Sequence, residues 1–170
     1  DVWKKRARRK TYREKYKEHD LVFLLDNGTQ DWWQPRKHLL DIYAEKCGVS
    51  LEERRPLIYL NDSDFEEAQK KIYELGISDK NKFLVLSPET RSKKKMKEWP
   101  YERFLLLIQK IRENHDFKII TLVSKDNPYN YDGTILLKGY PLGPSAAMIS
   151  RANFYLGLDN GLTHIASCFD

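Results

Sequence analysis

Asp159, Asn160, Gly161 and His164 place a carboxylate, an amide, a glycine and an imidazole within one short stretch near the end of the chain. The stretch follows the apolar run 154–158, which has the composition of a buried strand, and precedes a segment that could begin a helix. The first turn of a helix leaves backbone N–H groups free to bind an anion. The pattern therefore predicts a ligand site, although an ordinary strand–helix turn closed by a helix cap has the same spacing.

A second loop supplies positive charge. Thr90 follows the apolar run 83–87, and five basic residues come after it: Arg91, Lys93, Lys94, Lys95 and Lys97. A lysine opposite a helix N-terminus is a suitable site for a diphosphate, because the helix end is worth up to about 1 kcal/mol toward an anion. The residues leave open which lysine would meet phosphate. The chain has no GxGxxG or GxxxxGK[ST] sequence, which disfavours a dinucleotide oxidoreductase or a P-loop ATPase.

Alternating strands and helices would position these loops. Apolar runs predict parallel strands at 83–87, 117–124, 134–138 and 154–158. The exits of these strands are the loops 88–99, 125–133, 139–144 and 159–164. Because the carboxyl ends of parallel strands meet at one edge of a sheet, we expect the four loops to converge there. The fold class is therefore α/β, a doubly wound parallel sheet of the Rossmann-like type.

Helical periodicity connects the predicted strands. Ser63 and Glu66 have the form of a capping box, and the apolar spacing after them continues until Gly76. Pro100 suits the first position of the next helix, and a short helix is expected around 145–151. The sequence stops at residue 170 without the strand that should come next, so we expect an incomplete domain.

Composition places the chain among soluble globular proteins, with 41% hydrophobic and 32% charged residues. No apolar run approaches the roughly 20 residues of a membrane span, and the beginning of the sequence has no apolar signal-peptide core. Cys47 and Cys168 form neither a disulfide framework nor a zinc spacing, and the four histidines are scattered. We expect a cytoplasmic protein without a metal or other cofactor.

The first 18 residues form a basic arm. It contains nine lysines and arginines: Lys4, Lys5, Arg6, Arg8, Arg9, Lys10, Arg13, Lys15 and Lys17. Such clusters favour phosphates, anionic membranes or nucleic acid, although many are only solvated surfaces. The arm could hold the protein at the inner face of a membrane.

Three segments resemble glycosyltransferase family 9, the ADP-heptose:lipopolysaccharide heptosyltransferases. Residues 83–100, ending in Lys-Glu-Trp-Pro, are similar to the entry of the donor-binding domain in that family. Residues 137–152 are similar to its G-x-x-x-L…A-x-x-I-x-x-A passage, and 159–166 resemble its Asp-Ser/Thr-Gly-x-x-His-x-Ala motif. The resemblance covers roughly residues 20–170, and the order of the three segments makes it more specific than any one of them.

The resemblance implies a GT-B architecture, in which two Rossmann-like domains face each other and the second holds a nucleotide-sugar donor. Residues 61–170 would be this donor-binding domain, and 19–60 would be a remnant of the first domain with the inter-domain connector. The family transfers a sugar from a nucleotide diphosphate, here ADP-heptose, to a lipopolysaccharide-like or other glycan acceptor. Transfer inverts the anomeric centre and needs no metal.

The resemblance also assigns donor contacts to the first loops. Lys97 would contact the diphosphate, with Thr90 beside it. Tyr140 lies where the nucleobase packs in the family, and Asp126 would be a partner of the ribose or the base.

The last loop receives further roles from the resemblance. Asp159 would bind sugar hydroxyls, and His164 would brace the turn. Asn160, Gly161 and Leu162 would present backbone N–H groups to phosphate.

Three departures from the family pattern stand out. The first domain is essentially missing, so the general base of the family, an aspartate, has no counterpart and no catalytic residue is assigned. The 170 residues alone should bind the donor without turning it over. The loop from Thr90 to Lys97 is longer and more basic than usual, and Asn160 replaces a hydroxyl residue.

Two other interpretations remain open. One is a basic module that binds nucleic acid or an anionic membrane. The leading interpretation, in contrast, expects no nucleic-acid partner. The other is a non-catalytic Rossmann-like remnant. Steep salt dependence that disappears when residues 1–18 are deleted would identify the first.

Overall fold

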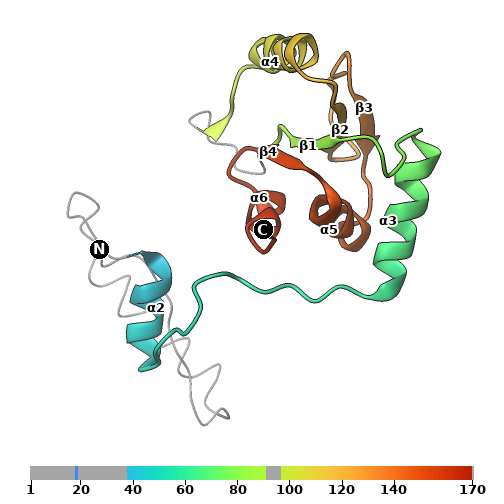
Figure 1. Cartoon of the computed structure of the whole chain (residues 1–170). Helices are drawn as coiled ribbons and strands as arrows, with labels where there is room; N and C mark the ends of the chain where they lie inside the picture. Colours follow the sequence, from blue (N-terminus) through green and yellow to red (C-terminus); the bar gives the residue numbers. More distant parts are fainter. Residues whose placement is uncertain (1–17, 19–37, 91–96, 170) are drawn as a thin grey trace. The chain divides into compact units, whose positions relative to one another are not determined.

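The computed structural model describes residue 18 and the ranges 38–90 and 97–169, and the chain forms two compact units, 1–54 and 55–170. The described part of the first unit contains the helix α2, Leu39–Cys47 (Figure 1). The imidazole of His38 caps it by accepting the N–H of Leu40 at 3.3 Å. Gly48 ends it in the left-handed conformation, with φ of 69°, which glycine adopts without strain.

The second unit contains a four-stranded parallel sheet. Its strands are β1 (Phe83–Ser87), β2 (Lys118–Val123), β3 (Ile135–Lys138) and β4 (Phe154–Gly157), in the order β3-β2-β1-β4. Val85 at the centre pairs with Ile120 of β2 on one side and with Tyr155 of β4 on the other. The expected α/β fold with a parallel sheet is confirmed.

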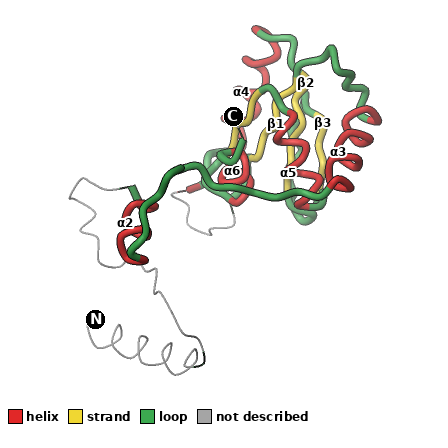
Figure 2. Tube along the Cα trace, turned by 60° about the horizontal axis from the view of Figure 1, so that its bottom comes forward, coloured by secondary structure: helices red, strands yellow, loops and turns green. Residues whose placement is uncertain are grey.

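Helices cover both faces of this sheet (Figures 1 and 2). The helices of the second unit are α3 (Asp62–Glu74), α4 (Tyr101–Asn114), α5 (Leu142–Arg151) and α6 (Gly161–Ala166). Side chains alternate along each strand, so neighbouring residues enter different cores. Val85 packs in the core with α3 and α5, whereas Leu84 and Leu86 pack with Phe104 and Ile108 of α4.

Two helix starts differ from the expected ones. The capping box predicted at Ser63 and Glu66 is wrong, because α3 is capped two residues earlier by Asn61. The carboxylate of Asp64 accepts the N–H of Asn61 at 3.1 Å, which supplies the reciprocal bond of a capping box. Asparagine is as good an N-cap as serine, so the earlier start gains helix without losing the cap. In the same way, Pro100 is the N-cap of α4 and not its first helical residue.

Several sequence predictions fall outside the described residues. These are most of the basic arm, residues 19–37 of the expected first-domain remnant, and the basic loop 91–96. Within the described ranges, no helix has the length and apolar character needed to cross a membrane. The same ranges contain no group of three or more His, Cys, Asp or Glu side chains that could hold a metal ion.

Candidate functional site

The exits of all four strands surround one cavity of about 640 Å³. β1 contributes Ser87, Glu89 and Thr90, β2 contributes Ser124, β3 contributes Gly139 and Tyr140, and β4 contributes Asp159, Asn160, Gly161 and Leu162. Leu122, Val123, Leu142 and Ile165 give the cavity an apolar lining. The expected convergence of the strand exits is therefore observed, and six of the nine predicted donor-binding residues line one space.

Asn160 joins the turn after β4 to the end of β1. Its side-chain oxygen accepts the N–H of Thr163 at 3.0 Å and so caps α6. Its amide nitrogen donates to the hydroxyl of Ser87 at 2.9 Å and to the carbonyl of Glu89 at 2.6 Å. A serine or threonine could cap the helix but could not also reach both acceptors. The asparagine that departs from the family pattern therefore adds a link between two strand exits.

The backbone at the start of α6 faces the cavity with free donors. α6 begins at Gly161, directly after its N-cap Asn160. Gly161 and Leu162 both line the cavity, and their N–H groups have no acceptor among the described residues. With only six residues, α6 has a small dipole, so most of the positive charge for an anion must come from a side chain.

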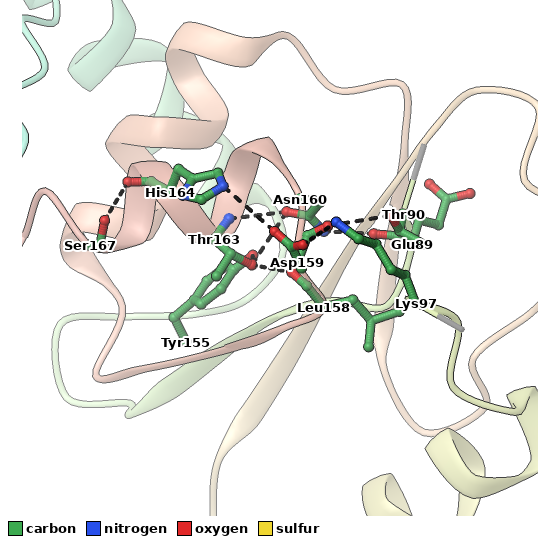
Figure 3. A network of polar contacts seen from close by, with 10 residues as sticks. All are labelled: Glu89, Thr90, Lys97, Tyr155, Leu158, Asp159, Asn160, Thr163, His164 and Ser167. Atoms are coloured by element: carbon green, nitrogen blue, oxygen red, sulfur yellow. Dashed lines mark hydrogen bonds and ion pairs between the residues drawn. The ribbon is translucent and has the colours of Figure 1, made fainter. Parts of the chain in front are cut away.

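Lys97 supplies that charge beside Asp159, although Lys97 itself does not line the cavity (Figure 3). Its ammonium group forms an ion pair with the Oδ2 atom of Asp159, and both side chains are about half exposed. The hydrogen bond from Lys97, followed by its charge, lowers the pKa of Asp159 below the ordinary carboxyl value. At neutral pH the carboxylate of Asp159, which lines the cavity, is therefore ionised beside the ammonium group of Lys97.

Two more predicted residues lie beside this pair. Thr90 donates its hydroxyl to the carbonyl of Asp159 at 3.3 Å, which fixes the turn against the exit of β1. The Nε2 atom of His164 lies 3.6 Å from the Oδ1 atom of Asp159, and 77% of the imidazole is exposed. His164 therefore contacts the turn from the solvent side.

Tyr140 and Asp126 are placed differently. Tyr140 lines the cavity, and its hydroxyl points to the carbonyl of Glu67 on α3 at 3.4 Å. Burial raises the pKa of Tyr140 to about 12, so the phenol stays protonated. Asp126 lies exposed in the loop after β2 and does not line the cavity, so the structure does not bring it together with the other predicted residues.

Glu89 is a cavity residue that sequence reasoning missed. Its carboxylate accepts the N–H of Ser124 at 2.5 Å, the hydroxyl of Ser124 at 3.0 Å and the amide of Asn127 at 2.5 Å. An acidic side chain directly after a predicted strand, in a loop expected to bind phosphate, was the only signal in the sequence. Its partners lie 35 and 38 residues away, so no local pattern could have identified them.

Comparisons with solved structures find the same fold in glycosyltransferases. A glycosyl transferase family 9 protein from Veillonella parvula DSM 2008 is 21% identical, with a TM-score of 0.62, over 78% of this chain and 41% of that one. ADP-heptose lps heptosyltransferase II of E. coli is 13% identical, with a TM-score of 0.56, over 72% and 40%. The E. coli heptosyltransferase WaaC with ADP is 18% identical, with a TM-score of 0.50, over 80% and 44%. The chain thus spans less than half the length of each protein.

A sequence comparison identifies the family. A search of the curated proteins found no match. The model of glycosyltransferase family 9 (heptosyltransferase), in contrast, matches residues 3–170, nearly the whole sequence. The resemblance carried by the three segments is thereby confirmed, and this chain belongs to glycosyltransferase family 9.

Proposed function

We propose that this chain binds the nucleotide-sugar donor of a heptosyltransferase-type enzyme in the cavity at the strand exits. The donor is an ADP-linked sugar, and the acceptor is a lipopolysaccharide-like or other glycan. Family membership supports the reaction class, and a heptosyltransferase of similar fold has been solved with ADP. Transfer proceeds with inversion and without a metal cofactor in this proposal.

The observation that carries the proposal is the ion pair between Lys97 and Asp159, in which Asp159 lines the cavity and Lys97 is held beside it. A nucleoside diphosphate sugar needs a cation for its phosphates and hydrogen-bond acceptors for its sugar hydroxyls. An ammonium group and a carboxylate side by side match the junction between these two parts. The free N–H groups of Gly161 and Leu162 add donors for the same phosphates.

Donor binding requires Lys97 to exchange partners. Its ammonium group is held by Asp159, and both groups are substantially exposed. Exposed ion pairs contribute little to stability, so a diphosphate can replace the carboxylate at small cost. Asp159 is then free to accept hydrogen bonds from sugar hydroxyls.

The apolar part of the cavity suits the nucleobase. Tyr140, Leu122 and Leu142 lie among its lining residues, and an aromatic ring with aliphatic neighbours favours a flat heterocycle. Asp126 would reach the ribose only if its loop changed position. His164 remains a bracing group of the turn in this proposal.

Lys97 also has a chemical role in the transfer step. When the bond between sugar and phosphate breaks, negative charge develops on the leaving diphosphate. An ammonium group already aimed at that position stabilises the charge without reorganisation. We assign no general base among the described residues.

Calorimetric titration of the chain with ADP, ADP-heptose and GDP tests the proposal. We expect saturable binding of both adenine nucleotides, with GDP weaker because the base packs in a shaped apolar site. Absence of any heat of binding at millimolar ADP and ADP-heptose would refute donor binding by this cavity. Adenosine serves as the control that contacts the base site but not Lys97.

A further inference from the structure

Glu89 lies at the centre of a hydrogen-bond network that joins the walls of the cavity. Its carboxylate receives three hydrogen bonds from the loop after β2, two from Ser124 and one from Asn127. Its backbone carbonyl receives a fourth from the amide of Asn160, which caps α6 (Figure 3). A single residue after β1 therefore holds both the exit of β2 and the exit of β4.

The network continues to the remaining strand, β3, through Asn127. The carbonyl of Asn127 accepts a hydrogen bond of 2.8 Å from the ammonium group of Lys138, which is the last residue of β3. The N–H of the next residue, Gly139, donates to the carbonyl of Val123 at 2.8 Å. Tyr140 follows directly in the chain and lines the cavity. The contacts of Glu89 thus reach from the turn that presents Asp159 to the loop that presents Tyr140.

A carboxylate is the side chain that this position needs. Glu89 meets three donors, of which only the Ser124 hydroxyl could also accept, and a carboxylate can accept all three bonds. Asn127 is only 6% exposed, so water cannot replace a lost partner there. The other end of its amide is also engaged, because its side-chain oxygen accepts the N–H of Tyr129 at 2.8 Å. Asn127 therefore cannot turn its amide around without losing that bond.

We propose that Glu89 is the positioning residue that joins the nucleoside end of the donor cavity to its diphosphate end. This inference rests on the proposed donor binding. Glu89 acts through Ser124, Asn127 and Asn160, and Lys97 remains the phosphate ligand. Loss of the carboxylate should weaken binding of adenosine as well as ADP, whereas loss of Lys97 should weaken ADP and leave adenosine unchanged.

A donor–acceptor exchange tests the link between Glu89 and Asn127. One oxygen of Glu89 accepts the amide of Asn127 and the hydroxyl of Ser124, and the other accepts the N–H of Ser124, so the amide nitrogen of Glu89→Gln faces a donor in either orientation. We therefore expect ADP and adenosine affinities to fall roughly tenfold. Adding Asn127→Asp supplies an acceptor for the introduced amide and keeps the acceptor for the N–H of Tyr129. The double variant should recover to within about threefold of the unchanged chain. Glu102→Gln, on the exposed first turn of α4, is the matched control and should bind normally.

Amide hydrogen exchange gives a second readout that needs no ligand. Asn127 is buried and the Ser124 N–H is exposed, so the oxygen of Glu89→Gln should stay on Asn127 and its amide nitrogen should face the Ser124 N–H. This N–H should therefore exchange faster in Glu89→Gln and recover its protection in the double variant. If Glu89→Gln does not fold, Ser124→Ala removes only the hydroxyl bond and should lower affinity about threefold.

The outcomes separate the two proposals. An unchanged chain that binds no ADP refutes donor binding, and exchange at Ser124 then still decides whether Glu89 joins the loops. Normal ADP affinity and normal exchange in Glu89→Gln overturn the positioning role. A double variant as weak as Glu89→Gln also overturns it. Selective loss of ADP binding with normal adenosine binding would make Glu89 a phosphate-end residue only, which contradicts the inference.

Discussion

Replacement of Asn160 measures how strongly the turn after β4 is tied to the end of β1. Asn160→Ala removes the cap on the N–H of Thr163 and the two donor bonds to Ser87 and Glu89. An N-cap is worth about 1 kcal/mol, and each partly buried hydrogen bond contributes about 0.5–1.5 kcal/mol. We therefore expect the free energy of unfolding to fall by about 2–4 kcal/mol.

Asn160→Ser separates the two functions of the side chain. Serine retains the cap on α6 but cannot reach both acceptors, so the expected loss is about 1–3 kcal/mol. Denaturant unfolding followed by circular dichroism measures both variants against the unchanged chain. Asn114→Ala is the matched control, since this asparagine makes one exposed bond to the carbonyl of Lys110. It should change stability by less than about 0.5 kcal/mol.

The order of the three variants is the decisive result. If Asn160→Ser is as stable as the unchanged chain, the donor bonds to Ser87 and Glu89 contribute nothing and only the cap matters. If Asn160→Ala stays within about 0.5 kcal/mol of the unchanged chain, the turn is not tied to β1 as the geometry indicates. Either result would refute the reasoning for this residue.

Three further predictions concern the cavity. Lys97→Ala should weaken ADP binding roughly tenfold or more in calorimetry, because it removes a charged hydrogen bond. Lys118→Ala, at the opposite end of the sheet, should bind ADP normally, and equal losses in the two variants would contradict the assignment. Lys97 lowers the pKa of Asp159, so the stability that this pair contributes is present above the ordinary carboxyl pKa and is lost as pH falls through the lowered value. In an NMR titration of Lys97→Ala the pKa of Asp159 should rise, and an unchanged pKa would contradict the ion pair. Tyr140→Phe should bind ADP almost normally, since the hydroxyl makes only one long bond, to the carbonyl of Glu67. Tyr140→Ala should bind ADP more weakly because it removes the aromatic ring, and equal ADP affinity of the two variants would exclude Tyr140 from base binding.

The fold was predictable because its main determinants are local. Each strand is a short apolar run, and β1 is buried over its whole length from Phe83 to Ser87, as expected for a strand covered on both faces. Parallel strands joined by helices must place their exits at one edge, so the convergence of Thr90, Tyr140 and Asp159 followed from topology. The start of α3 was missed because Asn61 and Ser63 are comparable caps and the sequence offers both.

The site was only partly predictable, since its geometry depends on long-range partners. Lys97 was singled out by resemblance and not by composition, because four other basic residues share its loop. The bonds of Glu89 could not be foreseen, since they join residues 35 or more positions apart. Asp126 does not line the cavity, because it lies at an exposed turn of the loop after β2.

The polar groups of the cavity divide into those that hold the walls and those that can change partners. Glu89 and Asn160 are occupied by bonds within the protein, so a ligand can contact them only by breaking the connections between strand exits. Lys97 and Asp159 are half exposed and bound mainly to each other, so they can exchange this contact for a ligand without moving the backbone.

Charge reversal exploits this difference. Exchanging the two groups in the double variant Lys97→Asp/Asp159→Lys should preserve the ion pair and the stability of the chain while abolishing ADP binding, because the cation then sits on the turn and the carboxylate faces the phosphates. Retained ADP binding in that variant, measured by calorimetry beside an unchanged unfolding midpoint, would show that the position of the cation does not matter and that the cavity binds its ligand by some other means.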